Sequence, residues 1–415
     1  MALKNDNYDV VIIGGGIVGT SAAYYLAKSG IRVALVEKGR IAGEQSGRNW
    51  GAVRVQGRDR AEIPLMLESI EIWKTLKLEL GETVDWTQQG QMLMAYNQKQ
   101  IAQLEAKVPT AQEFGIPSKI LTKAEVHQIL PHYHGKNCVG ALFNPLDGCA
   151  EPEKAAPALA RGARRHGVEI FEQCAVENIE TTNGVVSGVE TEIGFLKCDS
   201  VVMASGVWTS RLAKSLNINH PSLWIKGSVA RTAPLSIEMR KLVVWGATAY
   251  RQRSDGRVNI AVSEDGSHDL MLDSLRYGRK FLPLARKNWR LLHFHLGRPF
   301  VQSLMGEFSN YTTHRTLDPR PDWRGLNKAK TKFLEEYPVL LDIKFERAWA
   351  GYIDYMPDEL PVIDMRSNPS GLVIAAGLSG NGFGIGPIVG KTISDLIVTG
   401  KTRHDLTPFS SKRFA

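Results

Sequence analysis

A glycine-rich junction near the start of the chain limits the folds that this sequence can adopt. The apolar residues 10–13 precede the pattern Gly14-x-Gly16-x-x-Gly19, and residues 17–28 have the apolar spacing of a helix packed on a sheet. In such a junction the first glycine permits a tight turn, the second lets a diphosphate approach the backbone, and the third lets helix and strand pack closely. The alternative is a strand-to-helix turn whose glycines serve packing only.

A second strand favours the dinucleotide interpretation of this junction. The apolar run 31–36 ends on Glu37 and Lys38. Glu37 stands about 20 residues beyond the glycines, where an acid accepts hydrogen bonds from an adenosine ribose. The start of the helix, at Ile17 and Val18, offers free N–H groups to phosphates. The order of strand, glycines, helix, strand and acid therefore predicts a bound dinucleotide.

Length and composition predict a soluble globular protein of two domains. The chain has 415 residues, and no segment approaches the roughly 20 consecutive apolar residues of a membrane span. The opening MALKNDNYDV has no apolar signal core, so the expected location is the cytoplasm. The cysteines are scattered, without a C-x-x-C pair, which predicts reduced thiols and neither a metal site nor a disulfide framework; they are Cys138, Cys149, Cys174 and Cys198.

The net charge of +8 is spread along the chain and is not interleaved with stacking aromatic residues. We therefore expect no nucleic-acid partner, but a general preference for anionic substrates. Residues 276–298 are an exception, because their basic residues occur without an acid; these are Arg276, Arg279, Lys280, Arg286, Lys287, Arg290 and Arg298. This block is compatible with a peripheral contact to an anionic membrane or to an acidic partner, and also with a solvated helix face.

The pattern along the chain predicts an α/β protein with a discontinuous Rossmann-like domain. Residues 1–55, 145–225 and 348–415 alternate strands and helices, and the last of these segments repeats the theme of strand, glycine-rich turn and helix. Residues 56–144 and 226–347 contain shorter strands and the basic block. They are expected to form a second, α+β substrate domain built on a mostly antiparallel sheet.

Four stretches of the sequence together resemble the D-amino acid oxidase superfamily of flavoproteins, which includes glycine oxidase, sarcosine oxidases and amino acid dehydrogenases. They are GGGIVGTSAAYYLA with VEKG, then EQSGRNWGAVR, then VVMASGVW, and finally WAGYIDYMPDELPVI with GLSGNGFGIGP. The resemblance covers essentially the whole chain and implies FAD as the cofactor. The glycines of residues 379–386 fit this, since a second helix N-terminus would meet the flavin edge that becomes negative on reduction. The alternative is another packing turn.

The resemblance also implies where FAD would lie. Residues 45–51 would hydrogen-bond the pyrophosphate and isoalloxazine, the backbone of Val176 would meet adenine, and residues 204–206 would lie near the diphosphate. Alternatively, residues 45–51 form a polar surface loop and Trp208 belongs to the core. The predicted cofactor residues are Gly14, Gly16, Ile17, Val18, Gly19, Glu37, Lys38, Gln45, Ser46, Arg48, Asn49, Trp50, Gly51, Val176, Ala204, Ser205, Gly206, Trp208, Gly351, Ser379, Gly380, Asn381, Gly382, Phe383 and Gly384.

In this family the flavin takes a hydride equivalent from the carbon of a C–N bond, so no catalytic acid or base need be evident and none is predicted. A substrate carboxylate should meet an arginine fork. Arg54 is the first candidate, because it resembles the arginine that binds the carboxylate in sarcosine oxidases. Arg251, beside Tyr250, is the second; either arginine equally suits a surface salt bridge. Tyr352 would cap the substrate amine or simply pack.

Several positions depart from the family patterns. Ile353 stands where glycine oxidase-like proteins carry an arginine, and Asn381 and Gly384 replace a histidine and a lysine of the sarcosine-oxidase pattern. Gly351 stands where that pattern places a cysteine, and we therefore expect the FAD to be non-covalent.

The predicted function is FAD-dependent oxidation of the C–N bond of an amino acid or secondary amine by hydride transfer to flavin N5. The resulting imine would hydrolyse to an oxo acid or aldehyde plus an amine or ammonia. The electron acceptor would be O2 or a quinone- or dye-type compound, with Lys226 as a candidate residue near the flavin. The alternatives are an N-demethylating oxidoreductase and a flavin-binding sensor or subunit of a larger complex.

Overall fold

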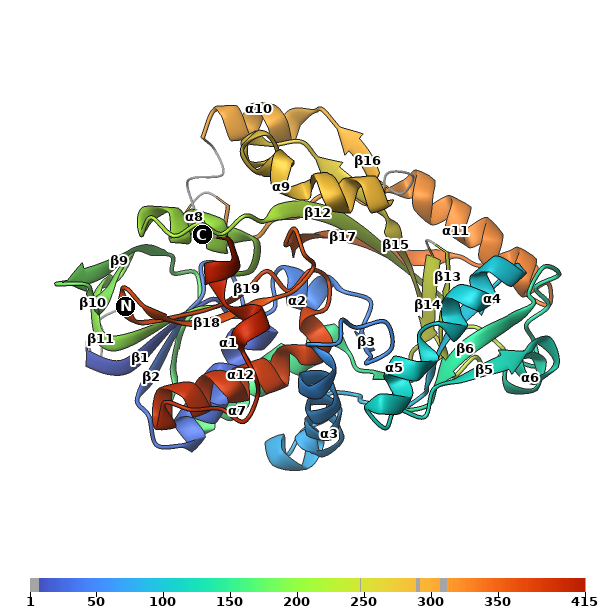
Figure 1. Ribbon diagram of the computed structural model, residues 1–415, viewed down its shortest axis with the longest axis horizontal. Coiled ribbons are helices and arrows are strands. Elements are labelled where there is room, and N and C mark those ends of the chain that lie inside the picture. The colour runs from blue at the N-terminus through green and yellow to red at the C-terminus, as the bar shows by residue number, and fades with distance from the viewer. Residues whose placement is uncertain (1–6, 247, 289–291, 307–311, 313, 415) are drawn as a thin grey trace.

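The structure, a computed structural model, describes residues 7–246, 248–288, 292–306, 312 and 314–414. In these residues two large sheets lie beside each other along the long axis of the molecule (Figure 1). The chain passes between them several times, so each sheet is assembled from segments far apart in the sequence. The predicted discontinuous α/β architecture is confirmed.

The first sheet has eight strands in the described residues, in the order β18-β19-β10-β11-β1-β2-β8, with β9 paired to β10. The pairs β2–β8, β1–β2, β1–β11 and β11–β19 are parallel, which is the Rossmann-like part of the sheet. The strands are β1 (Asn7–Ile13), β2 (Val33–Val36), β8 (Glu169–Phe171), β9 (Val176–Thr182), β10 (Val185–Thr191), β11 (Gly194–Met203), β18 (Val362–Ser367) and β19 (Ser370–Ala376).

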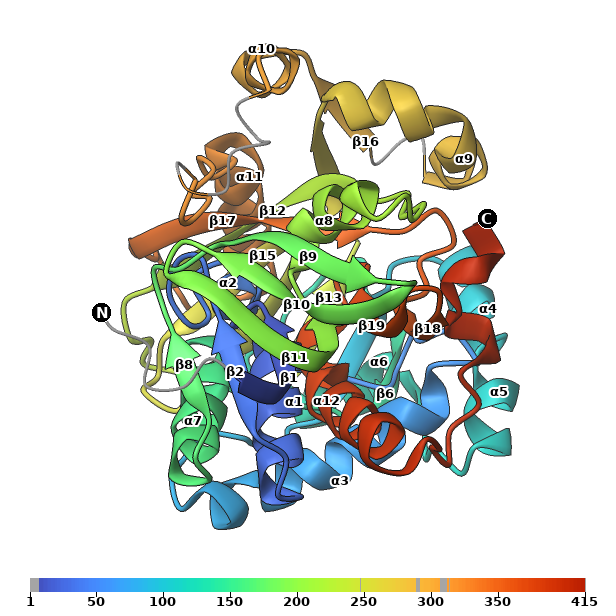
Figure 2. The same ribbon diagram turned by 90° about the vertical axis from the view of Figure 1, so that its left-hand side faces the viewer.

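The alternation of side chains along β1 explains why this sheet is buried on both faces. Val10 and Ile12 pack into one core with a helical layer, whereas Val11 and Ile13 pack into a second core on the opposite face. Figure 2 shows the helices of the first core below the sheet. They are α1 (Ile17–Lys28), α3 (Ile63–Leu80), α7 (Pro152–Arg165) and α12 (Gly382–Thr399).

The second sheet has nine strands in the described residues, in the order β17-β12-β15-β14-β13-β4-β6-β5, with β16 beside β15. It is mostly antiparallel, as predicted, with parallel pairs only at β13–β4 and β15–β16 in the described residues. The strands are β4 (Gln91–Ala95), β5 (Lys119–Thr122), β6 (Gly140–Asn144), β12 (Leu223–Thr232), β13 (Leu242–Trp245), β14 (Thr248–Gln252), β15 (Val258–Asp269), β16 (Leu292–His295) and β17 (Phe345–Tyr355).

The remaining elements connect or cover the two sheets. They are the paired strands β3 (Ala52–Val53) and β7 (Gly148–Cys149), the helices α2 (Gln45–Arg48), α4 (Gln98–Glu105), α5 (Val108–Glu113), α6 (Lys123–Ile129), α8 (Thr209–Ser215), α9 (Leu272–Asn288), α10 (Arg298–Leu304) and α11 (Trp323–Glu336), and the 3-10 turns η1 (Gly206–Trp208), η3 (Thr407–Phe409) and η4 (Ser411–Phe414).

One local feature differs from the sequence interpretation. β17 pairs along its length with β12, so residues 348–355, which the predicted boundary gives to the FAD-binding domain, belong to the second sheet. The rest of the domain division stays a prediction.

In the described part of the chain, no helix combines the length and apolarity needed to cross a bilayer.

Candidate functional site

A cavity of about 990 Å³ lies between the two sheets. Its first wall is made where three parallel strands end, at Gly14 after β1, at Glu37 after β2 and at Ala204 after β11. Its second wall comes from β12 and β17 of the other sheet. Ligands of open α/β sheets bind outside the carboxyl ends of the strands, and this volume is at the upper end of the range for small-molecule sites.

The first glycines shape the wall at the start of α1. Gly14 has φ +109°, and its N–H donates to the Val36 carbonyl, which turns the chain out of β1. A Cβ on Gly19 would overlap the Gly14 carbonyl oxygen, so only glycine lets α1 approach the strand this closely. The Ser46 hydroxyl accepts the N–H of Ile17 at 2.8 Å. This contact brings the loop after β2 against the first helix N-terminus.

Glu37 closes the far end of this wall. Its two carboxylate oxygens accept the backbone N–H groups of Gly15 and Gly39, each at 2.7 Å. Burial raises the pKa of Glu37 to about 7, although both N–H donors lower it. Each carboxylate oxygen retains a lone pair. Glu37 can therefore accept a ribose hydroxyl without losing these contacts.

Residues 45–51 form a braced loop on the cavity wall. Arg48 donates to the carbonyls of Gly43 and Ala350, both at 3.0 Å. The Asn49 amide donates to the Ser46 carbonyl, and its side-chain oxygen accepts the N–H of Gly51. The side chains of Arg48 and Asn49 therefore hold the loop in place through protein groups.

Lys38 and Trp208 are joined through an acid that the sequence analysis missed. The Lys38 ammonium lies 2.6 Å from the Glu44 carboxylate and 4.6 Å from the centre of the Trp208 ring. The Trp208 indole N–H donates to Glu44 at 3.1 Å. All three line the cavity beside Val176. Glu44 is the first residue of the stretch EQSGRNWGAVR, but its contacts with Lys38 and Trp208 depend on the packing of segments far apart in the chain.

The second glycine cluster brings another helix N-terminus to the cavity. α12 begins at Gly382 after Asn381, and Ser379, with φ +46°, turns the chain toward it. The fully buried Asp354 supports this turn, because its carboxylate accepts the N–H of Gly377 at 2.6 Å and the Gln45 amide at 2.8 Å. Burial raises the pKa of Asp354 to about 6. Asp354 is therefore a buried link between the two loops.

Most of the predicted cofactor residues are brought together around this one cavity. The lining includes Gly14, Gly16, Ile17, Val18, Glu37, Lys38, Gln45, Ser46, Arg48, Asn49, Trp50, Val176, Ala204, Ser205, Gly206, Trp208, Gly351, Ser379, Gly380, Asn381, Gly382 and Phe383. Gly19, Gly51 and Gly384 do not line it. Gly19 packs on β1, and the Gly384 carbonyl accepts hydrogen bonds from Ser69 and Trp73 inside the helical layer.

Two of the four predicted substrate residues lie away from the cavity. Tyr250 points into the core of the second sheet and hydrogen-bonds the Tyr337 hydroxyl. Arg251, the next residue of β14, points the opposite way, and its Nε donates to the Trp50 carbonyl behind the loop. Both side chains are fully buried among protein groups, so the prediction that they bind substrate is wrong for this geometry.

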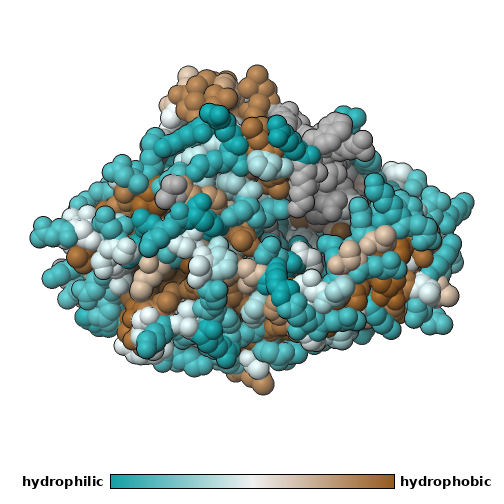
Figure 3. Space-filling model, in the orientation of Figure 1, coloured by the Kyte–Doolittle hydropathy of each residue, from teal (hydrophilic) through white to brown (hydrophobic). Residues whose placement is uncertain are grey.

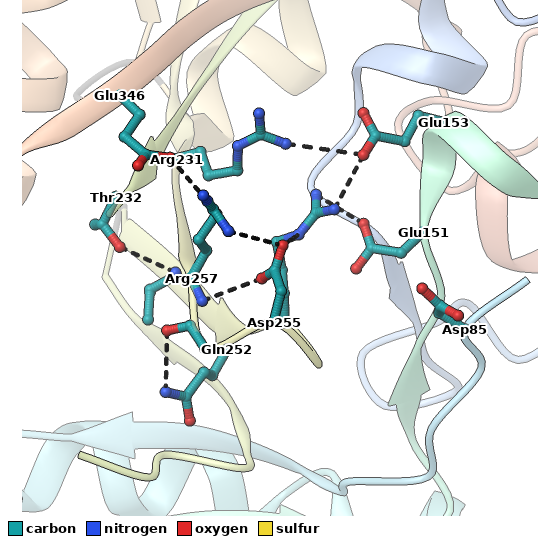
Figure 4. A network of polar contacts seen from close by, with 12 residues as sticks. Asp85, Glu151, Glu153, Arg231, Thr232, Gln252, Asp255, Arg257 and Glu346 are labelled. Carbon is teal, nitrogen blue, oxygen red and sulfur yellow. Dashed lines mark hydrogen bonds and ion pairs between the residues drawn. The ribbon is translucent and has the colours of Figure 1, made fainter. Parts of the chain in front are cut away.

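Arg251 begins a charged network that links the second sheet to the start of α7. It pairs with Glu151, just before α7, and Arg253 lies 2.8 Å from the same carboxylate and 3.0 Å from Glu153. Figure 4 shows Glu153 beside Arg231 of β12, and Arg257 of the β14–β15 hairpin beside Asp255 and Glu346, the latter from β17. This network fixes how the second wall of the cavity meets the first.

The other two predicted substrate residues do line the cavity. The Arg54 guanidinium donates to the Gln56 carbonyl at 2.6 Å and lies 3.3 Å from Asn381 Oδ1. The Tyr352 hydroxyl donates to Asp269 at 2.8 Å, and Lys226 Nζ lies 3.8 Å from the same carboxylate. Burial raises the pKa of the Tyr352 phenol. Arg54 keeps guanidinium hydrogens beyond its two contacts, and a carboxylate can use them.

The basic block lies on α9, above β12 in Figure 1. Arg276, Arg279, Lys280 and Arg286 are exposed. Arg290 and the side chains of Lys287 and Arg298 lie outside the described residues. Ser274, Gly278, Phe281, Leu282, Leu284 and Ala285 of the same helix line the cavity.

The cavity fits FAD on the chemistry of its walls. Two helix N-termini, at Ile17 and Gly382, face one space, and Glu37 stands at one end of it. A Cβ on Gly16 would occupy the space in front of the first helix N-terminus, 3.0 Å from Ser46 Oγ. Because position 16 is a glycine, this space is open to a ligand. Anionic groups are stabilised at such N-termini. The residues around Ile17 would hold the diphosphate, and those around Gly382 the flavin.

Comparison with known proteins agrees with this chemistry. A model of the FAD dependent oxidoreductase family (DAO) matches residues 9–396. The chain belongs to that family. The predicted family, fold class and FAD cofactor are thereby confirmed for this FAD-dependent oxidoreductase.

Relatives of this oxidoreductase include proteins named for amine and amino acid substrates. Monomeric sarcosine oxidase of Arthrobacter sp. (strain TE1826) is 26% identical over 100% of this chain and 98% of its own length. Mitochondrial dimethylglycine dehydrogenase of Mus musculus is 26% identical over 99% of this chain, which spans only 44% of that relative. The solved structure of L-amino acid deaminase from Proteus myxofaciens, in complex with anthranilate, is 28% identical, with a TM-score of 0.94 over 100% of this chain and 95% of that one.

Proposed function

We propose that this protein oxidises the C–N bond of an amino acid or of an N-substituted amino acid, with Arg54 binding the substrate carboxylate. The main observation in support of this proposal is that Arg54 lines the same cavity as Gly380 and Asn381, beside the second helix N-terminus. FAD held by the residues around Ile17 and Gly382 would supply the acceptor for a hydride equivalent from the carbon next to nitrogen. The substrate carbon must therefore lie near the flavin, and an anchor beside that helix N-terminus holds it there.

The surroundings of Arg54 support its assignment as the anchor. Arg58 is the nearby alternative, but its donors already meet Glu62 at 3.2 Å, the Arg54 carbonyl at 3.0 Å and the Asn381 carbonyl at 3.2 Å. Its side chain is only 2% exposed. Arg54 meets one backbone carbonyl and one amide oxygen and no carboxylate in the described residues. A substrate carboxylate would supply the missing charge partner.

Tyr352 and its partners form the opposite part of the wall. Tyr352, on β17, is in register with Lys226 of β12, and both contact the buried carboxylate of Asp269. Tyr352 donates its proton to Asp269, so its oxygen presents lone pairs to the cavity. We propose that this oxygen receives an N–H of the substrate amine, and that Lys226 contributes positive charge beside the flavin.

The electron acceptor and the membrane contact form a further part of the proposal. We propose that FAD is bound non-covalently and reoxidised by O2 or by a quinone-type acceptor. We also propose that the protein is cytoplasmic and rests on an anionic membrane through α9 and α10. Arg276, Arg279 and Arg286 give this face its charge. Exposed apolar side chains of this face include those of Leu275 and Met305. Figure 3 shows a hydrophobic patch at the top of the molecule, where Figure 1 places α10.

The test is anaerobic mixing of the purified yellow protein with D- and L-amino acids and N-methylated amino acids. Loss of the visible flavin band identifies substrates, formaldehyde among the products identifies N-demethylation, and oxygen uptake measured beside dye reduction identifies the acceptor. Arg54→Met should raise KM for carboxylate substrates tenfold to roughly a hundredfold, since a charged hydrogen bond contributes about 1.5–3 kcal/mol. The exposed Arg60→Met is the matched control. Flavin that no compound bleaches would overturn the proposal and favour a sensor or a non-catalytic subunit.

A further inference from the structure

Two buried glutamines in the wall of the cavity have side-chain oxygens without a partner. Gln56 is 5% exposed and Gln91 is 1% exposed, and both line the cavity. Among the described residues, neither Gln56 Oε1 nor Gln91 Oε1 has a hydrogen-bond partner. Buried amide groups are nearly always paired, because removing them from water without a partner costs free energy. An unpaired oxygen of this kind in a ligand cavity indicates that the ligand provides the donor.

Both glutamines lie against strand β6. The Gln56 amide nitrogen donates to the Leu142 carbonyl of β6 at 3.2 Å, which fixes which side-chain atom is the oxygen. Gln91 begins β4, and β4 and β6 pair so that Gln91 is opposite Asn144 and Leu93 is opposite Leu142. Gln91 and Leu93 therefore face the same side of the sheet, and both line the cavity.

Gln56 adjoins the proposed carboxylate anchor. Arg54 Nη1 donates to the backbone carbonyl of Gln56 at 2.6 Å, so the guanidinium and the Gln56 residue are in direct contact. The same cavity is also lined by the apolar residues Leu93, Val244 and Val262. A substrate whose carboxylate meets Arg54 can therefore lay an aliphatic stem on these residues and reach the two amides with its end.

Two buried acids lie near the glutamines. Glu62 pairs with the buried Arg58, and the Asp147 carboxylate accepts the N–H of Val55 at 2.7 Å. Burial raises the pKa values of Glu62 and of Asp147. A second carboxylate on the substrate would have to be buried beside these acids without a counter-ion, which is unfavourable. The subsite therefore disfavours an anionic side chain, and its two amide oxygens suit a group that donates hydrogen bonds.

We propose that Gln56 and Gln91 form a neutral hydrogen-bonding subsite that receives a carboxamide or similar polar side chain of the amino acid held by Arg54. This inference rests on the proposed function and names its substrate class. Sites built to hydrogen-bond a substrate group reject analogues that lack it, because the protein groups are then left unpaired. Glutamine should therefore be a better substrate than methionine, which has a similar length but no N–H group in its side chain.

The experiment measures anaerobic flavin reduction by both enantiomers of glutamine and of methionine, with wild type, Gln91→Met and the exposed surface control Gln112→Met. Gln91→Met keeps the side-chain length and removes the amide. Wild type and Gln112→Met should reduce at least tenfold faster with glutamine at subsaturating concentration, and Gln91→Met should lose most of that ratio. Equal rates for the two amino acids in wild type, or an unchanged ratio in Gln91→Met, would overturn the subsite.

A binding measurement separates this inference from the proposed function. The probes are 4-carbamoylbutanoate and hexanoate, two carboxylates without an amine, whose binding is followed by the shift of the flavin spectrum. Tighter binding of 4-carbamoylbutanoate to wild type, lost in Gln91→Met with unchanged flavin content, supports the subsite even if no amino acid is oxidised. Equal affinities of the two probes contradict the subsite and leave C–N oxidation standing if other amino acids bleach the flavin.

Discussion

Arg251 and Glu151 form a buried two-pronged ion pair that joins β14 of the second sheet to the start of α7, with Nη1 2.9 Å from Oε1 and Nη2 3.2 Å from Oε2. Arg251 also donates to the carbonyl of Trp50, so the same guanidinium supports the loop of residues 45–51. Removing one partner of a buried pair leaves a charge without compensation and typically costs about 3–5 kcal/mol. We expect Arg251→Met to lower the free energy of unfolding by about that amount and to weaken FAD binding.

Denaturant unfolding and titration with FAD measure both effects. The matched control is Arg161→Met, which removes an ion pair to Glu82 whose arginine side chain is 51% exposed. Exposed pairs contribute about 1 kcal/mol or less. An Arg251→Met protein as stable as the control would show that Arg251 does not hold β14 to the start of α7.

The contact between Gly19 and Gly14 predicts a strong effect of one added methyl group. A Cβ at position 19 would overlap the Gly14 carbonyl oxygen, so Gly19→Ala must push α1 away from β1. We expect this variant to be purified with much less bound FAD than wild type. The ratio of flavin to protein absorbance measures this, and Gly297→Ala is the control, because a Cβ at position 297 meets nothing closer than 3.9 Å.

Asp354 predicts how stability depends on pH. Its folded-state pKa of about 6 lies above the ordinary value of 3.8, because burial disfavours the charged form. The folded protein therefore binds this proton more tightly, and the contribution to stability is fully present below about pH 4 and is lost as the pH rises through about 6. The shift corresponds to about 3 kcal/mol.

Asp354→Asn does not titrate, so its stability relative to wild type should increase between pH 4 and pH 7, as measured by urea unfolding of the flavin-free protein. Glu82→Gln is the control, because hydrogen bonds from Arg161 lower the pKa of Glu82. The stability of Glu82→Gln relative to wild type should therefore decrease as the pH rises, which is the opposite of the change expected for Asp354→Asn. Parallel stability curves for wild type and Asp354→Asn would contradict the raised pKa.

Gly351 predicts how the flavin is released. This position has no side chain, and a Cβ there would lie 3.1 Å from the Cβ of Arg48. The residue thus offers no thiol for a covalent bond to the flavin. Acid precipitation should leave intact FAD in the supernatant, identified by chromatography, and yellow colour retained in the washed precipitate would contradict non-covalent binding.

The exposed face of α9 predicts binding to anionic vesicles. Each basic residue near such a surface contributes about 1 kcal/mol. The double variant Arg276→Glu and Arg279→Glu should float less with phosphatidylserine vesicles than wild type, and salt should weaken wild-type binding. Lys328→Glu and Lys401→Glu, two exposed lysines on other elements, form the charge-matched control. Equal flotation of both double variants would exclude this face as the contact.

The sequence alone determined the elements whose signals are local. The glycines between β1 and α1, the acid after β2, and the glycine-rich turn before α12 follow from spacing within short segments, and the structure confirms them. The resemblance to flavoproteins added the later loops that meet at the same cavity. Such features are predictable because the residues that make them are neighbours in the chain.

Only the tertiary structure decided which candidate side chains reach the cavity. Tyr250 and Arg251 lie on opposite faces of β14, and protein covers both faces. The alternation of side chains along the strand predicts that the two point in opposite directions, but it does not predict that both are buried away from the ligand cavity. Gln56 and Gln91 are far apart in the chain, and each lies against β6 in the folded protein. Their proposed role depends on buried side-chain oxygens that have no hydrogen-bond partner. Whether a buried polar atom has a partner is decided by how distant segments pack together, and no local sequence pattern predicts it.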